Sequence, residues 1–446
     1  MTIAHWIARA KPRPFRLATG ATVAAAAALV LTGCVPGSAQ PATEVDQKEG
    51  PAELLVWTDS TREAAFKMYA EEHPEVDLTI EILPDDVEQR LLLANQAGEG
   101  WPDIITLNKF QIDAFSSEPV NYSANIAPYL SDGFFDDFAP AVVESCSPEA
   151  DDVRCVPNDI SPIVLWYNAP FLAENGYDIP ETWEEFEALG LQIAQEHPGY
   201  IVSDGAVRLS MFPPSRCPQA EKVDELTILS DLADPKCERV ISMVDNLLAA
   251  GAMTPLAGNS PEFIAEFGEP KKLAMLVGPA HVGKFRLLDA YGWQPGDLGV
   301  APPLRWADED EVFNYSSGVS YAVSRHSEYL QAATDVVEWL ATGPYQTAEE
   351  TVTLPAYKPA QDNWITTNEA SFVIEDGSLA DVFEAAQDSL SNYWFEMPVE
   401  SVRASWDQVV MPGIAQGKTV AELVPTWQQY IIDEGEAAGW TVETER

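Results

Sequence analysis

The chain has 446 residues, which is long enough for two or three domains. Its residues are 46% hydrophobic and 22% charged, a composition that excludes a disordered or fibrous protein. The 71 acidic and 25 basic residues leave a formal charge of −46, which repels phosphate backbones, so nucleic acid is excluded as a partner.

Residues 1–33 have the layout of a secretory signal peptide. They contain no acidic residue, and their basic residues precede an uncharged apolar run from Leu17 to Gly33. That run is shorter than the ~20 residues of a membrane-spanning helix. It ends in Leu31-Thr32-Gly33-Cys34, which resembles the lipobox of bacterial lipoproteins. We therefore expect Cys34 to be diacylated and to become the first mature residue; an ordinary cleaved signal or an uncleaved anchor is the alternative.

The next segment has the composition of a tether. Val35 to Pro51 is rich in Pro, Gly, Ser and charged residues and has no apolar periodicity. We expect residues 34–51 to form a flexible, lipid-anchored linker, and the folded chain to begin at Glu53.

Strands and helices alternate over the first part of the folded chain. The predicted elements are strands at 53–57, 76–83 and 103–107, each followed by a helix, of which the first two span 63–73 and 87–97. This alternation predicts βαβ units in a parallel sheet with helices on both faces. Ligands of such sheets bind at the carboxyl ends of the strands.

A second set of elements begins with a strand at 161–167. Thr182 and Glu185 are three residues apart and predict a capping box at the start of a helix. The later elements are helices at 239–250, 329–342, 402–416 and 420–435 and strands at 272–277, 298–302 and 316–323.

Four cysteines remain besides Cys34. Cys146 and Cys155 are nine positions apart, and Cys217 and Cys237 are twenty apart, in loop-like sequence. Four cysteines allow three pairings. We favour the two local disulfides, because an oxidising compartment favours disulfides and neither spacing fits a structural zinc site. No metal site is expected.

Short segments along the chain share their order and spacing with one family. They are Leu54–Trp57, Gly100–Asp103, Val156–Asp159, Leu165–Asn168, Asn175–Glu184, Lys272–Pro279, Gly299–Pro303 and Gly417–Glu422. Collinear over roughly residues 53–435, they resemble the extracellular solute-binding proteins of carbohydrate importers driven by ATP-binding cassettes.

The resemblance implies an α/β fold of the type II periplasmic-binding-protein class, with two lobes that are joined by a three-segment hinge and close on a ligand. The expected lobes are 52–158 with 304–355, and 159–303 with 356–446, and the crossings are expected near 158–162, 298–304 and 354–360. The resemblance also implies a monomer without cofactor or catalysis. It would sit on the extracytoplasmic face of the cell membrane, capture a saccharide, and deliver it to the permease and ATPase subunits of an importer.

Sugar binding needs flat aromatic faces for pyranose C–H groups and polar side chains for hydroxyls. In the first lobe the candidates follow strand ends: Thr58 and Asp59, which could instead cap the next helix, and Asn108. Asn158 and Asp159 lie on the first expected crossing and are the strongest polar candidates.

Further candidates follow from the resemblance. His281 stands where family members commonly carry a tryptophan, so it is expected to form hydrogen bonds rather than stack, although a lone histidine is more often structural. Ser317 and Gly318 resemble the small residues that let a ligand approach the backbone. Tyr357 follows the third crossing. Trp394 is the expected stacking residue.

Two other functions stay open on sequence alone. The same fold could bind a polyamine, a metal chelate or another solute, for which a carboxylate-rich cleft would be expected. A lipid-anchored glycoside hydrolase would need two carboxylates on either side of the scissile bond. The acidic residues do not exclude such a pair, but the chain has no G-x-S-x-G or H-E-x-x-H motif.

Overall fold

The computed structural model describes residues 45–83, 87–108, 111–112, 115–116, 121–147, 151–208, 210–224, 227–316, 318–348, 351–391, 402, 404–437 and 439–445. The expected signal peptide, Cys34, Ser317 and Trp394 lie outside these residues. The predictions about them therefore stay predictions.

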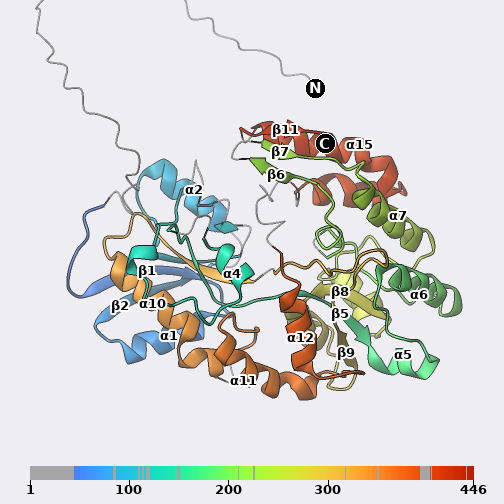
Figure 1. Cartoon of the computed structure of the whole chain (residues 1–446), viewed down its shortest axis with the longest axis horizontal. Coiled ribbons are helices and arrows are strands. Elements are labelled where there is room, and N and C mark those ends of the chain that lie inside the picture. Colours follow the sequence, from blue (N-terminus) through green and yellow to red (C-terminus); the bar gives the residue numbers. More distant parts are fainter. Residues whose placement is uncertain are drawn as a thin grey trace, which may run out of the picture. The chain divides into compact units, whose positions relative to one another are not determined.

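The first lobe is built on a five-stranded sheet in the order β2-β1-β3-β10-β4 (Figure 1). The strands are β1 (Ala52–Thr58), β2 (Val76–Ile82), β3 (Ile104–Asn108), β4 (Val156–Pro157) and β10 (Val319–Val323). β1 pairs in parallel with β2 and β3, as the strand–helix alternation predicts. β10 runs antiparallel to β3 and β4, so the expectation of a wholly parallel sheet is wrong. The reason is that β10 returns from the second lobe and enters this sheet from the opposite end.

Helices cover this sheet through buried apolar faces. α1 (Glu63–Glu72) buries Ala65, Phe66 and Tyr69, which recur at helical spacing. Phe66 lies edge-on to Tyr321 of β10, with ring centroids 5.7 Å apart. α2 spans Val87–Ala97 and α10 spans Leu330–Thr342, both close to the predicted bounds.

The second lobe contains a three-stranded sheet in the order β8-β5-β9. β5 (Ile163–Asn168) is buried at every position, which explains its continuous apolar sequence. It runs antiparallel to β8 (Met275–Pro279) and β9 (Leu298–Ala301). The helices α5 (Ala169–Asn175), α6 (Trp183–Glu196) and α7 (Pro235–Ala249) belong to this lobe.

The capping box predicted for α6 is present. The N–H of Glu185 donates to Thr182 Oγ1 (3.2 Å), and the N–H of Thr182 donates to the Glu185 carboxylate (3.2 Å). Two backbone donors at the helix start are thereby satisfied.

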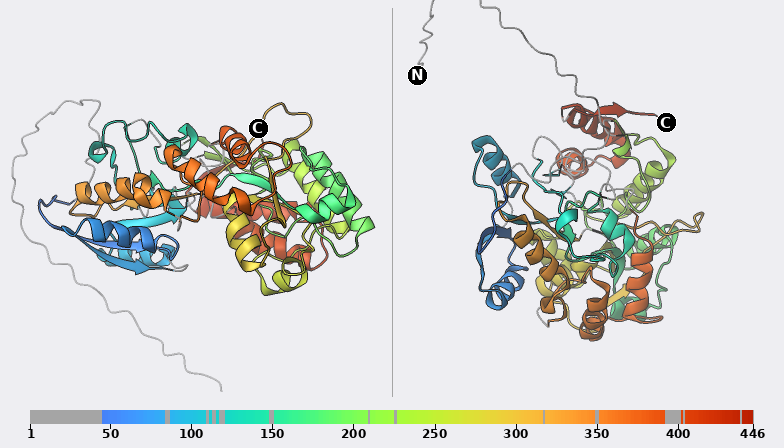
Figure 2. Two further views of the ribbon diagram at one scale, coloured as in Figure 1. Left: turned by 90° about the horizontal axis from the view of Figure 1, so that it is seen from below. Right: turned by 60° about the vertical axis from the view of Figure 1, so that its left-hand side comes forward.

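Several elements escaped the sequence analysis. A small sheet joins β6 (Glu221–Asp224) and β7 (Thr227–Leu229) to β11 (Thr441–Glu443) beside α15 (Val420–Ala437) (Figures 1 and 2). The unpredicted helices are α11 (Lys358–Asn368) and α12 (Leu379–Asp388), and the predicted 402–416 helix contains a π-helical segment, Trp406–Val410, before α14 (Met411–Ala415).

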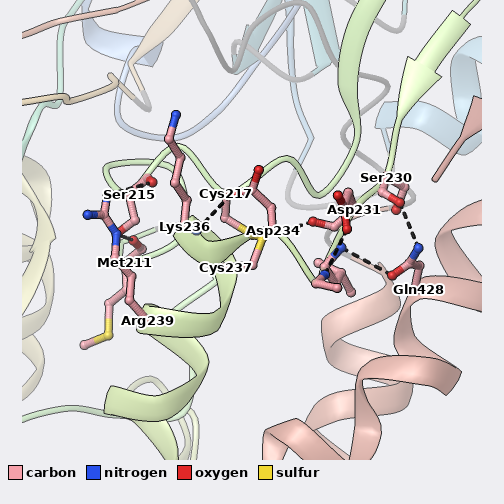
Figure 3. The surroundings of a disulfide bond; sticks show 12 residues. Met211, Ser215, Cys217, Ser230, Asp231, Asp234, Lys236, Cys237, Arg239 and Gln428 are labelled. Carbon is pink, nitrogen blue, oxygen red and sulfur yellow. Dashed lines mark hydrogen bonds between the residues drawn. A yellow bond between two sulfur atoms is a disulfide. The ribbon is translucent and has the colours of Figure 1, made fainter. Parts of the chain in front are cut away.

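Both favoured disulfides are confirmed. Cys146 is bonded to Cys155 and Cys217 to Cys237, with Cα–Cα distances of 4.9 and 4.6 Å. Figure 3 shows that the second disulfide ties a loop to the first turn of α7, where Asp234 caps the helix by accepting from the Lys236 N–H.

The second crossing lies later in the chain than expected. Trp306 packs against Trp183 of α6 (ring centroids 6.1 Å), and Arg305 pairs with Thr182, so residues 304–315 stay with the second lobe. The expected crossing at 298–304, and the assignment of 304–315 to the first lobe, are therefore wrong. The chain meets the first crossing segment at Ser316, which pairs with Pro162, and enters the first-lobe sheet at β10.

Part of the expected tether, residues 34–51, is bonded to the first lobe. Gln47 Oε1 accepts from the N–H of Leu330 at the start of α10 (2.8 Å). The N–H of Lys48 donates to the Glu328 carbonyl (2.8 Å), and the Lys48 ammonium pairs with the Glu328 carboxylate. The last part of the segment 34–51 is thus a strap on the first lobe.

Within the described part of the chain, no helix combines the length and the apolar character that crossing a membrane requires.

Candidate ligand-binding site

Three chain segments cross side by side between the lobes. The N–H of Asn158 donates to the carbonyl of Val319 (2.9 Å), and that of Ile160 donates to the carbonyl of Leu354 (2.9 Å). The N–H of Ala356 donates to the carbonyl of Asn158 (3.1 Å). These bonds hold the first segment between the other two and form the floor of the space between the lobes.

Gly318 serves this crossing rather than an open surface. A Cβ added at this position would overlap the backbone carbonyl of Asp159 and lie close to Ile160. We expected Gly318 to let a ligand approach the backbone. The first crossing segment occupies that space instead.

Asp159 is the centre of a buried polar network. It is 5% exposed, and its carboxylate pairs with the guanidinium of Arg62, which immediately precedes α1. Asp159 Oδ1 accepts from the N–H of Val319 (3.0 Å), and Oδ2 accepts from the hydroxyl of Thr353 (3.2 Å). One carboxylate thus joins the first lobe to all three crossing segments.

Arg62 keeps its charge in this network. Burial alone would lower the pKa of the guanidinium, but the carboxylates of Asp159 and Asp59 raise it above its usual value. Asp59 is half-exposed and contributes a second ion pair to Arg62 (2.7 Å).

The amide of Asn158 is also engaged inside the protein. Its Oδ1 accepts from the hydroxyl of Tyr321 and from Nε2 of Gln346, both at 2.9 Å. Its Nδ2 donates to the carboxylate of Asp159 (2.8 Å). The two strongest polar candidates of the sequence analysis are therefore held in contacts within the hinge.

The other first-lobe candidates lie at strand ends, as predicted. Thr58 is buried and shares a hydrogen bond with Thr106 (2.8 Å) across β1 and β3. Asp59 Oδ1 accepts from the N–H groups of Thr61 and Arg62 in the turn before α1. The helix itself has Arg62 at its N-cap and no side-chain cap, so Asp59 shapes the turn rather than capping α1.

Asn108 closes a reciprocal turn with Gln111. The Gln111 N–H donates to Asn108 Oδ1, and the Asn108 N–H donates to Gln111 Oε1, both at 3.1 Å. Asn108 is only partly buried, so it remains accessible at the carboxyl end of β3.

His281 meets the first crossing from the second lobe. Its Nδ1 lies 2.8 Å from the hydroxyl of Ser161, and its N–H donates to the same oxygen (3.0 Å). Burial lowers the pKa of His281 to about 4, and the charges of Arg286 and Arg62 act in the same direction, whereas Asp159 opposes them. The ring is therefore neutral at pH 7.

This pKa predicts a pH dependence of stability. In the unfolded chain His281 takes up a proton near pH 6.5, but in the native state only near pH 4, so the unfolded state binds more protons between these values. We expect the contribution of His281 to the free energy of unfolding to be complete above about pH 6.5. It should fall by as much as about 3 kcal/mol as the pH drops to 4. Urea unfolding of the parent and of His281→Asn at each pH measures it. A stability difference between the two that stays constant from pH 7 to pH 4 would contradict the prediction.

Tyr357 is placed away from the crossing floor. It pairs with Phe138 in the first lobe, and their ring centroids are 5.7 Å apart. This packing gives Tyr357 a structural contact, and its side chain is only partly buried.

A pocket opens beside the second crossing segment. It is lined by Ala141, Val142, Ser145, Asp159, Ser316, Gly318, Ser320 and Leu390. Ala141 and Val142 belong to α4 (Pro140–Glu144). Its enclosed volume is about 20 Å³, and it is partly open to solvent. That volume holds little more than a water molecule and is far below the about 300–1,000 Å³ of small-molecule sites, so the pocket marks a position beside the crossing rather than a complete ligand site.

Arg62 is the main residue of the site that the sequence analysis missed. Its position directly after the Thr58–Thr61 turn could have indicated a role in the site, since a basic side chain there can reach the strand ends. Its partner Asp159 is 97 residues away, so the ion pair could not be read from local sequence.

Comparisons with known proteins agree with this architecture. Residues 56–213 match the family model of the bacterial extracellular solute-binding proteins. No curated protein matches the sequence significantly.

Several solved structures resemble the chain at low identity. A binding protein associated with an ABC transporter of B. animalis subsp. lactis Bl-04, in complex with β-1,6-galactobiose, has 19% identity and a TM-score of 0.71, covering 88% of this chain and 99% of its own. The galacto-N-biose-/lacto-N-biose I-binding protein of Bifidobacterium longum has 17% identity and a TM-score of 0.73, covering 89% and 100%. The GacH receptor of Streptomyces glaucescens, whose complexes include acarbose, has 20% identity and a TM-score of 0.64, covering 87% and 98%.

The fold is that of the type II periplasmic-binding proteins, two α/β lobes joined by three crossing segments. The family whose model matches residues 56–213 is the one that the sequence resembles.

Proposed function

We propose that this protein is the extracytoplasmic binding component of an ABC importer, and that it captures a neutral saccharide between its lobes. The observation that carries the proposal is the three-segment crossing between two α/β lobes, shared with binding proteins whose solved complexes contain oligosaccharides. Such a protein binds its solute and hands it on unchanged, so no catalytic residue is proposed.

The charges around the crossing favour a neutral solute over a cationic one. Asp159 and Asp59 are both paired with Arg62. In the second lobe the buried carboxylate of Asp204 accepts from Arg286 (2.7 Å) and from the N–H of Gly258 (3.1 Å). A polyamine site would need carboxylates that are free to pair with the ligand, whereas each of these three already forms an ion pair with Arg62 or Arg286.

The contacts proposed for the sugar come from both sides of the crossing. Asn108 offers a partly exposed polar side chain at the end of β3, and Ser317 follows Ser316, which lines the pocket together with Gly318. Trp394 remains our proposed stacking residue. It comes four positions after Leu390, another residue of the pocket lining, and so is within chain reach of the pocket.

The experiment is a thermal-stability titration against neutral mono- and oligosaccharides, with spermidine as the cationic alternative. A ligand that binds the native state raises its stability by RT ln(1 + [L]/Kd), so the correct sugar gives a shift that grows with its concentration. Chromatography of the same mixtures should recover the sugar intact. Stabilisation by spermidine alone, or turnover of a glycoside, would refute the proposal.

We also propose that Cys34 carries the lipid that holds the mature protein on the outer face of the cell membrane. The support is the sequence Leu31–Cys34 after a basic and then apolar segment. Cys34→Ala is expected to move the protein from the membrane fraction to the soluble one, because acyl chains are its expected anchor. A Cys34→Ala protein that still sediments with membranes would disprove lipid anchoring.

A further inference from the structure

One aromatic side chain of the second lobe is exposed beside the crossing segments. Phe285 is 38% exposed. Among the residues that the structure describes, the exposed large apolar side chains are Ile82, Leu92, Leu93, Val223 and Phe285, of which Phe285 alone is aromatic. Single exposed apolar side chains are common on protein surfaces, so it is the position of Phe285, rather than its exposure alone, that points to a function.

The helix that carries Phe285 fixes its direction. α9 (Ala280–Val282) continues into a π-helical segment, Gly283–Ala290. Val282, Gly283 and Leu287 are buried, and a Cβ at Gly283 would overlap the indole of Trp166. This face of the helix is therefore packed on the core of the second lobe, and Phe285 lies on another face. π-Helical turns are rare and often occur at functional sites.

The face that carries Phe285 also carries His281. The two residues are four apart, and their ring centroids are 6.4 Å apart. His281 bonds to Ser161 of the first crossing segment, so this face adjoins the floor between the lobes. Phe285 follows His281 by four residues, so it lies about one turn further along the same segment.

The chemistry around the ring suits a neutral, partly apolar ligand. Lys284 pairs with Asp289 (2.5 Å), and Arg286 pairs with Asp204 (2.7 Å), so the charged neighbours of Phe285 are occupied. His281 is neutral at pH 7 because burial lowers its pKa to about 4, and it presents a polar ring edge beside the phenyl face. An aromatic face next to a neutral hydrogen-bonding group matches one face of a sugar ring.

We propose that Phe285 is the second-lobe residue on which a ring of the saccharide packs. This inference rests on the proposed function and adds a contact residue to it. Phe285 supplies the apolar surface for the sugar ring. The neutral His281 and the ion-paired residues around Phe285 favour a sugar over an ion.

The test is calorimetric titration of Phe285→Ala, Phe285→Tyr and the parent with galactose, maltose, β-1,6-galactobiose and lacto-N-biose. Val223→Ala is the matched control, because Val223 is an exposed apolar residue (54%) on β6 of the same lobe. We expect Phe285→Ala to weaken binding of the recognised sugar about five- to fifty-fold. Phe285→Tyr keeps the ring face and should bind within about three-fold of the parent.

The melting temperature of each unliganded variant separates contact from folding. Because Phe285 is exposed, its truncation should leave that temperature nearly unchanged. Parent-like affinity of Phe285→Ala, or an equal loss in Val223→Ala, would overturn the inference while the parent's binding of a sugar upholds the proposed function. A parent that binds none of the four sugars and no other neutral saccharide would overturn both.

Discussion

Asp159→Ala is expected to lower the free energy of unfolding by about 3–5 kcal/mol. The substitution leaves the guanidinium of Arg62 buried without its nearest carboxylate. It also removes the acceptor of the Val319 N–H and of the Thr353 hydroxyl, both in crossing segments. Urea unfolding at pH 7 measures the loss, and the sugar affinity measured alongside shows whether the distorted crossing also impairs binding.

Asp59→Ala is the matched control for this change. It removes the other carboxylate paired with Arg62, but that carboxylate is half-exposed, so we expect a loss of only about 1 kcal/mol or less. Replacing the buried pair together, as Arg62→Met with Asp159→Leu, should recover much of the stability, because no buried charge is left unpaired and only the half-exposed Asp59 loses its partner. Equal losses for Asp59→Ala and Asp159→Ala would show that burial of the Asp159 pair is not what matters.

Loss of the Cys217–Cys237 disulfide is the second large expected effect. Cys217→Ser with Cys237→Ser opens a 20-residue loop, which in the chain-entropy model lowers the free energy of unfolding by about 3 kcal/mol. Ser215 lies two residues before Cys217, and its hydroxyl accepts from the Trp306 indole (2.9 Å) and its carbonyl from Arg239 (3.4 Å). Figure 3 shows Ser215 and Arg239 on one side of the disulfide and the Ser230–Gln428 contact on the other.

Thermal unfolding with and without dithiothreitol tests this prediction alongside the double variant. Cys146→Ser with Cys155→Ser is the comparison, because it opens a loop of 9 residues and should cost slightly less. All four cysteines are buried, so reduction should require prior opening or unfolding of the chain. A Cys217→Ser/Cys237→Ser protein as stable as the parent would show that packing alone holds this loop.

Locally encoded features of the fold could be predicted from the sequence. The Thr182–Glu185 capping box, the bounds of α2 and the strand–helix alternation of the first lobe depend on residues within one or two turns of each other. The start of α12 had the same kind of signal, since Ser378 and Asp381 form a capping box that the analysis overlooked.

Features that depend on distant residues could not be predicted in this way. The direction of β10 depends on the lobe from which the chain enters the first-lobe sheet. The edge strand β11 pairs with β7, which lies some two hundred residues earlier. The second crossing was misplaced for the same reason, because the packing of Trp306 on Trp183 extends the second lobe beyond residue 304.

The candidate site shows a similar division. Polar residues were found at the strand ends, where the fold places them, but the sequence could not show that the carboxylate of Asp159 and the amide of Asn158 are used up by Arg62, Tyr321 and Gln346. A polar residue at a strand end is therefore a candidate for ligand contact only when its side chain has no hydrogen bond or ion pair to a buried residue.

The strap at Gln47 and Lys48 sets the radius within which a lipid-anchored form could meet its transporter. Twelve residues separate Cys34 from Gln47, and such a segment spans at most about 45 Å. The anchor would confine the protein to a layer of about this depth above the bilayer, so its concentration at a transporter in the same membrane would exceed that of the same number of freely diffusing copies. A docking surface would then need less affinity than one that recruits its partner from solution. Releasing the strap would lengthen the reach and dilute the encounter without altering the sugar site.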